Sequence, residues 1–146
     1  MSTLYESDLF AWTKQQKDLL LSKKWNEIDF TNIAEEIEDL GDAKRLSLES
    51  YLTVLFQHWI KKEYAPEMQG NSRSWDASIE NSLIKIHRIL KKNPALKREM
   101  SDMLEFSYQS GKRAAIGECL LIQMDLIPKE CPWTLDDILD TKQGEK

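Results

Sequence analysis

Four carboxylates crowd the stretch from Asn32 to Gly41, which contains no basic residue and has the apolar spacing of a helix. On a helix, Glu35 lies four residues before Asp39, so like charges occupy positions where ion pairs usually stabilise a helix. Something outside this helix must compensate the charge. The candidates are a cation on another helix, a metal ion, a partner protein or the solvent.

A metal site would combine Glu35 and Glu36 with an imidazole, for which His58 is the first candidate. Di-metal sites in helical bundles use a Glu-x-x-His pair on one helix, and this sequence lacks that pair. Glu38 and Asp39, like Glu35, are also expected to point away from the apolar stripe of their helix. We therefore favour a solvated acidic face over metal binding, and we expect no cofactor.

His58 is expected on a partly buried side of a long central helix. Because imidazole titrates in a useful pH range, one hypothesis is a hydrolase or nuclease-like enzyme. In that enzyme His58 and Glu36 would transfer protons and Arg73 would bind the anion. The simpler interpretation is a core histidine held by one hydrogen bond, to Tyr51 or a carboxylate, because a lone histidine carries little catalytic specificity. The same interpretation is favoured for His87.

Arg73 lies between two serines at an expected helix start, where free N–H groups and a guanidinium would suit a phosphate or carboxylate ligand. The alternative is an internal ion pair between Arg73 and the acidic cluster formed by Glu35, Glu38 and Asp39. We favour the ion pair, since it would satisfy both features at once. It predicts that the two segments are neighbours in the fold.

The net charge is −5, but residues 85–113 carry 8 basic and 3 acidic side chains. This basic segment could contact nucleic acid phosphates. We disfavour that role because the whole protein is acidic and the segment lacks a recognition-helix motif. The basic residues concerned are Lys85, Arg88, Lys91, Lys92, Lys97 and Arg98.

Only five Gly and four Pro interrupt the sequence, and no useful stretch alternates apolar with polar residues, so an all-α fold is expected. A first helix is predicted from Ser7 or Asp8 to about Lys23. Asp29 is the predicted N-cap of a second helix, with Ile28 and Ile33 as a hydrophobic staple. Later helices are predicted from Asn71, Ser72 or Ser74 to about Leu90, from Pro94 onwards, and from Thr134 to about Asp140.

The second helix is expected to bury a stripe made of Ile33, Ile37 and Leu40. Gly41 either ends this helix or bends it before a run from Asp42 to Glu63, which is apolar on several sides and predicts a buried central helix. Gly111 and Gly117 pose a similar question in the segment 94–122. They either permit close helix approach or break the helix.

With 146 residues, the chain is expected to form one domain, with an ordered core at about 4–140 and a frayed tail at 141–146. We predict a helical bundle of about four to five main helices plus a short C-terminal helix. No apolar run is long enough to span a membrane, and the start of the chain does not resemble a secretory signal. The two cysteines are expected to be reduced, so the prediction is a cytoplasmic protein.

Several motifs occur together in a characteristic order: Tyr5-Glu6-Ser7-Asp8 with Ala11-Trp12, the stretch from Asn32 to Gly41, His58-Trp59-Ile60-Lys61, Ser72-Arg73-Ser74-Trp75, and Cys131-Pro132-Trp133-Thr134. In this order they resemble the bacterial family called domain of unknown function 29, found mainly in cyanobacteria. The resemblance covers about residues 4–140. It implies an all-helical, bundle-like domain in a bacterial cytoplasm, and it brings no catalytic residues with it.

The functional prediction is a non-enzymatic module that binds another protein or a second copy of itself. It rests on the many charges, the acidic helix and 13 aromatic residues. An exposed apolar patch near Trp133 or Trp25 would support it. The candidate interface or ion-pair residues are Glu35, Glu38, Asp39, Arg73 and Trp133.

Overall fold

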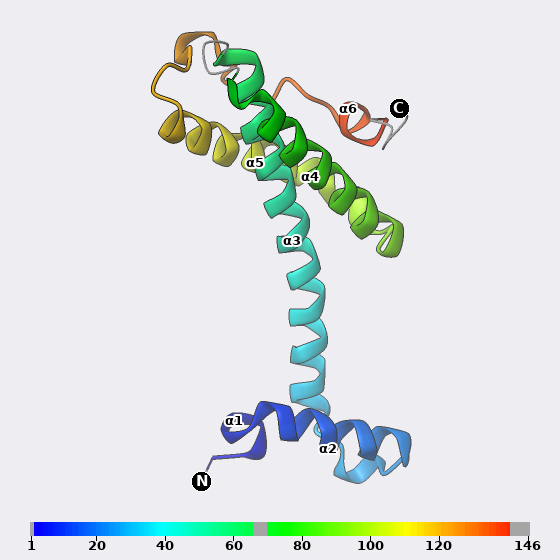
Figure 1. Ribbon diagram of the computed structural model, residues 1–146. Helices are drawn as coiled ribbons and strands as arrows, with labels where there is room; N and C mark the ends of the chain where they lie inside the picture. Colours follow the sequence, from blue (N-terminus) through cyan, green and yellow to red (C-terminus); the bar gives the residue numbers. More distant parts are fainter. Residues whose placement is uncertain (1, 66–69, 141–146) are drawn as a thin grey trace. The chain divides into compact units, whose positions relative to one another are not determined.

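A computed structural model describes residues 2–65 and 70–140, and every regular element in these ranges is helical (Figure 1). The predicted all-α class is therefore confirmed. The chain divides into two compact units, Met1–Ala43 and Lys44–Lys146. The expected single-domain organisation stays a prediction, and the expected loop at Pro66 and the frayed tail lie outside the described residues.

The first unit begins with two helices, α1 (Leu4–Ser7) and α2 (Leu9–Leu21), and a 3-10 turn η1 (Trp25–Glu27). Asp8 starts α2, because its Oδ1 accepts a hydrogen bond from the Ala11 N–H at 2.9 Å. This agrees with the predicted start of the first helix.

Asp29 connects the helices of the first unit. Its side chain accepts hydrogen bonds from Trp12 Nε1 at 3.2 Å and from the Asn32 backbone N–H at 3.3 Å. Its own backbone N–H donates to Gln16 Oε1 at 2.8 Å. The predicted N-cap is thus confirmed, and the bonds from Asn32 hold the pKa of the Asp29 carboxyl below its ordinary value.

Helix α3 (Phe30–Tyr64) runs without a break through Gly41 and contributes residues to both units. A Cβ at Gly41 would meet nothing within 4 Å, so no close contact requires the glycine there. One glycine costs a helix only about 1 kcal/mol, which the good helix formers on either side offset. The sequence alternatives of an end or a bend are thereby decided in favour of one long helix.

The predicted buried stripe on the first part of α3 is wrong for two of its three residues. Ile37 is 64% exposed and Leu40 is 62% exposed, while Ile33 is half-buried. The reason is that α1 and α2 cover the adjacent side of α3, where Tyr5 donates a hydrogen bond to Glu36 at 2.7 Å. The apolar stripe itself stays open to solvent.

The second unit contains the rest of α3, α4 (Ser72–Lys92), α5 (Leu96–Glu118), the 3-10 turn η3 (Met124–Leu126) and α6 (Leu135–Leu139). The C-terminal half of α3 is the predicted central helix. Its fully buried residues are Leu48, Leu52, Leu55, Phe56 and Ile60. On α4, Trp75, Leu83 and Ile86 are buried.

Helix α5 crosses α3 at Gly111, where the two backbones approach closely. A Cβ at Gly111 would lie 2.7 Å from the Thr53 carbonyl oxygen and 2.9 Å from the Gln57 nitrogen. Gly117, by contrast, has nothing within 4 Å of the same position. Close helix approach therefore explains Gly111 but not Gly117. Helix α5 is continuous through both glycines.

The ends of the later helices agree only partly with the predicted caps. Thr134 caps α6 in a reciprocal arrangement with Asp137, as its spacing predicts. However, α5 begins at Leu96 after Ala95, two residues beyond the predicted start at Pro94. The Asn93 side chain instead closes α4, donating to the Ile89 carbonyl at 2.9 Å.

No helix within residues 2–65 or 70–140 combines the length and apolar character needed to cross a bilayer.

Candidate functional site

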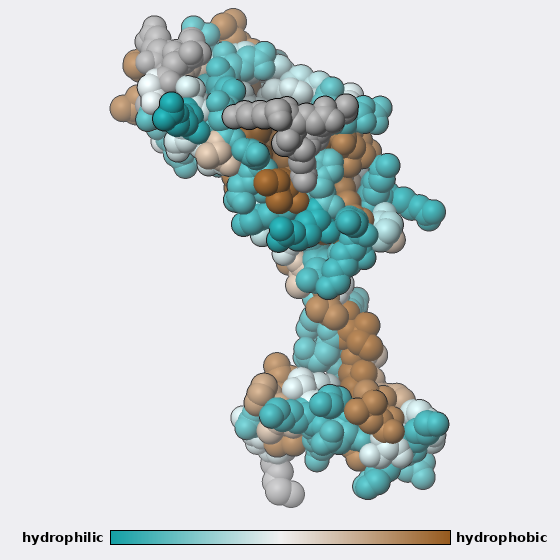
Figure 2. All heavy atoms as spheres, turned by 45° about the vertical axis from the view of Figure 1, so that its right-hand side comes forward, coloured by the Kyte–Doolittle hydropathy of each residue, from teal (hydrophilic) through white to brown (hydrophobic). Residues whose placement is uncertain are grey.

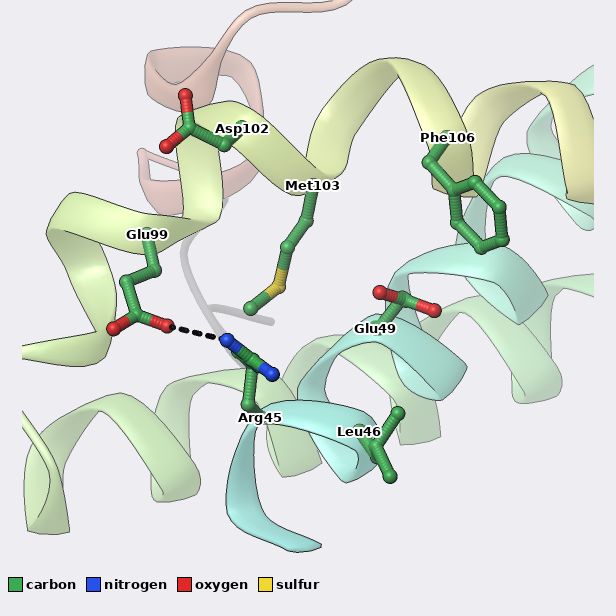
Figure 3. A pocket seen from close by; sticks show the side chains of 7 residues that line it. All are labelled: Arg45, Leu46, Glu49, Glu99, Asp102, Met103 and Phe106. Atoms are coloured by element: carbon green, nitrogen blue, oxygen red, sulfur yellow. Dashed lines mark ion pairs between the residues drawn. The ribbon is translucent and has the colours of Figure 1, made fainter. Parts of the chain in front are cut away.

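A groove of about 460 Å³ lies between α3 and α5 in the second unit (Figure 3). Its lining combines three carboxylates, one guanidinium and three apolar side chains. These residues are Arg45, Leu46, Glu49, Glu99, Asp102, Met103 and Phe106.

Helical spacing places these side chains along one groove. The residues from α5 stand at positions 99, 102, 103 and 106, which share one face of a helix. Those from α3 stand at positions 45, 46 and 49. Met103 is only 6% exposed, whereas Leu46 and Phe106 are 60% and 61% exposed. The groove is therefore open and has apolar walls.

The charges of the groove are unbalanced. Arg45 Nη1 lies 3.9 Å from Glu99 Oε2, and the two side chains are 50% and 53% exposed. An ion pair so open to water contributes little to stability. Glu49 and Asp102 add two further carboxylates, so the lining carries a net negative charge that would favour a cationic ligand.

The groove lining contains no histidine, cysteine, serine or threonine. The lining therefore offers no hydroxyl or thiol of these residues as a nucleophile and no imidazole for proton transfer. Apolar walls with a charged rim resemble a protein–protein interface, which has an apolar centre and a polar edge.

A second exposed surface lies on the first part of α3, in the other unit. We define the α3 stripe as Phe30, Ile33, Ile37 and Leu40. Phe30, Ile37 and Leu40 are 57%, 64% and 62% exposed. Figure 2 shows apolar side chains open to solvent along this part of α3. Exposed apolar residues gathered on one helix face are characteristic of an interface.

His58 and Glu36 each have a hydrogen-bond partner within their own unit. His58 is half-buried, and its Nδ1 lies 2.8 Å from the Val54 carbonyl oxygen, which places the proton on Nδ1. Glu36 accepts the bond from Tyr5 and thereby raises the pKa of Tyr5 to about 12. A site built from His58, Glu36 and Arg73 would draw on both units and stays a prediction.

The acidic residues Glu35, Glu38 and Asp39 are exposed on α3 in the first unit, and a solvated face stays a prediction. Arg73 is exposed at the start of α4 in the other unit. Their ion pair therefore stays a prediction. In the part of the chain that the structure describes, no three His, Cys, Asp or Glu side chains are grouped so that they could hold a metal ion.

Trp133 is half-buried in an aromatic cluster of the second unit. Its ring stacks on Phe56 with centroids 5.7 Å apart, and it also contacts Trp59 and Tyr108 at 5.1 and 6.0 Å. Trp133 thus contributes to packing. Trp25, in contrast, is 56% exposed.

His87 is half-buried on α4, and its Nε2 has no hydrogen-bond partner among the described residues. Cys119 and Cys131 are free thiols, and burial raises the pKa of both. These thiols are therefore poor nucleophiles at neutral pH.

Sequence reasoning missed both the groove and the exposure of the α3 stripe. The spacing of Glu99, Asp102 and Phe106 indicates that they share one helix face. The sequence does not indicate which helix packs beside that face, because helices that are distant in sequence meet only in the tertiary structure.

A family model described as domain of unknown function DUF29 matches residues 4–143 of the chain. No curated protein and no solved structure matches the sequence significantly.

Proposed function

Since the chain belongs to the family described as domain of unknown function DUF29, whose description assigns no activity, we propose from its surfaces that it is a protein-interaction module. One observation carries this proposal, namely the α3 stripe, with three large apolar side chains more than half exposed on one helix face. The groove between α3 and α5 supports the same role through its exposed apolar walls.

The sparse core of the first unit strengthens the proposal. Its described residues include only two buried apolar side chains, Trp12 and Ile28. A unit of about 40 residues rarely forms a sufficient core alone and usually gains stability from an additional partner. Covering the α3 stripe would supply the missing apolar burial.

We also propose that the module acts in a bacterial cytoplasm. The high charged fraction of 31%, the two free thiols and the family resemblance support this location.

The test is a quantitative pull-down with the tagged full chain and two matched variants. Leu40→Glu places a charge on the α3 stripe, and Leu126→Glu places it at an equally exposed position outside both the stripe and the groove. We expect a defined protein, a second copy included, that the wild type and Leu126→Glu retain and that Leu40→Glu loses. Equal recovery by all three proteins would contradict the proposal.

A further inference from the structure

We propose that the α3 stripe binds the α3 stripe of a second copy of this chain, so that two copies associate as a symmetric helix pair. This inference rests on the proposed interaction function and names the partner. Three observations carry it: the spacing of the stripe, the charges beside it and the sparse core of the first unit.

The spacing of the stripe is that of a self-pairing helix. Phe30, Ile33, Ile37 and Leu40 follow one another at intervals of three, four and three residues. These are the intervals of the a and d positions in a heptad, which form the seam between two packed helices. A second copy presents the same seam, so the contact is self-complementary and closes after two chains.

The charges beside the stripe do not oppose such pairing, although the helix is acidic. The positions that flank a heptad seam, e and g, are here Ala34, Glu36, Gly41 and Ala43. Three of the four are small and permit close approach of two helices. Glu36, the one carboxylate among them, already accepts the hydrogen bond from Tyr5.

The other carboxylates lie away from the seam. Glu35, Glu38 and Asp39 occupy outer heptad positions and are exposed. In a pair of copies they would remain in water rather than face one another. The arrangement therefore removes the repulsion that an acidic helix would otherwise meet in a second copy of itself.

The size of the seam sets the strength of the association. Four side chains from each copy bury less area than a standard protein interface, so the pair is expected to be weak and to depend on concentration. The seam ends at Lys44, whose ammonium occupies the next a position. A polar residue at that position limits the seam to the first part of α3.

The experiment is sedimentation equilibrium of the full chain over a wide concentration range. We expect the wild type to shift from monomer to dimer as its concentration rises. Ile37→Glu and Leu40→Glu should raise the dissociation constant at least about tenfold, because each places a charge in the apolar seam. Leu126→Glu, at an equally exposed position outside the stripe and the groove, is the matched control and should dimerise like the wild type.

Far-UV circular dichroism checks that the variants keep their helices, as expected for substitutions at exposed positions. A wild type that stays monomeric at every concentration would overturn the inference, as would a dimer that Leu40→Glu and Leu126→Glu weaken equally. If the chain is monomeric but the pull-down shows a different protein bound through Leu40, only the identity of the partner is wrong. If neither measurement responds to Leu40→Glu, the proposed function fails as well.

Discussion

Lys61 and Glu118 form an ion pair and hydrogen bond between α3 and α5. The Lys61 side chain is 7% exposed, whereas that of Glu118 is 58% exposed. The ammonium is therefore almost buried and depends on this carboxylate for its compensation. The hydrogen bond from Lys61 holds the pKa of Glu118 below its ordinary value.

The change Glu118→Gln should destabilise the protein at neutral pH by about 1 kcal/mol, a value discounted for the exposure of the carboxylate. Because the folded pKa of Glu118 is lowered, its contribution is complete above the unfolded pKa and is lost as the pH falls through the folded pKa. The difference in the free energy of unfolding between the wild type and Glu118→Gln should thus become smaller in acid. Urea unfolding at neutral pH and near pH 3 measures this difference.

Glu130→Gln serves as the control for this pH dependence, since Glu130 is also an exposed carboxylate near the end of the described chain. The control should unfold like the wild type at both pH values. A Glu118→Gln effect that is equal in neutral and acidic solution would contradict a role for the ionised pair.

Single residues were predictable where their partners are close in sequence. The caps at Asp29 and Thr134 depend on backbone N–H groups three residues away, so local spacing identified both. The Nδ1 partner of His58 was not among those expected, because the Val54 carbonyl takes the place of Tyr51 or a carboxylate. Local spacing does not decide between several partners within reach.

Helices α3 and α5 pack so closely at Gly111 that the position has no room for a side chain. The atoms in the way belong to the backbone of α3, namely the Thr53 oxygen and the Gln57 nitrogen. Backbone atoms cannot rotate aside as a flexible side chain does. A substitution there must separate the two helices.

Gly111→Ala should lower the free energy of unfolding by about 1–3 kcal/mol, although alanine is the better helix former. Gly117→Ala is the matched control, because this exposed glycine of the same helix has open space around it. The control should be stabilised by up to about 1 kcal/mol. Chemical denaturation of both variants measures the difference, and equal effects at the two positions would show that the helices are not in close contact at Gly111.

At the scale of elements, periodicity predicted where helices occur better than what they bury. The central part of α3 is buried as predicted, since its apolar residues face several sides. The α3 stripe has equally regular spacing, and yet Ile37 and Leu40 are exposed. A regular stripe indicates that a face has to be covered, but it does not identify what covers the face.

The buried apolar cluster of the molecule lies between Leu48 and Ile138, within the second unit. The first unit contributes Trp12 and Ile28 as its buried apolar residues among those described. Since burial of apolar surface is the main stabilising term, the two units should differ in their independent stability.

The fragment 44–146 should fold alone and unfold cooperatively, whereas the fragment 1–43 should lack a cooperative transition at low micromolar concentration. Thermal circular dichroism of both fragments and the full chain measures this. A fragment starting at Phe56 is the control, because it removes the buried Leu48, Leu52 and Leu55 and should not fold. Failure of the fragment 44–146 to fold would mean that the first unit is part of the core.

The sequence by itself determined the helical class, most helix positions and the local caps. These depend on interactions within a few residues, which sequence spacing records directly. The tertiary structure decided the continuity of α3 through Gly41, the close contact at Gly111, the groove between α3 and α5 and the exposure of the α3 stripe. Each of these depends on whether distant segments meet, and local periodicity carries no record of that.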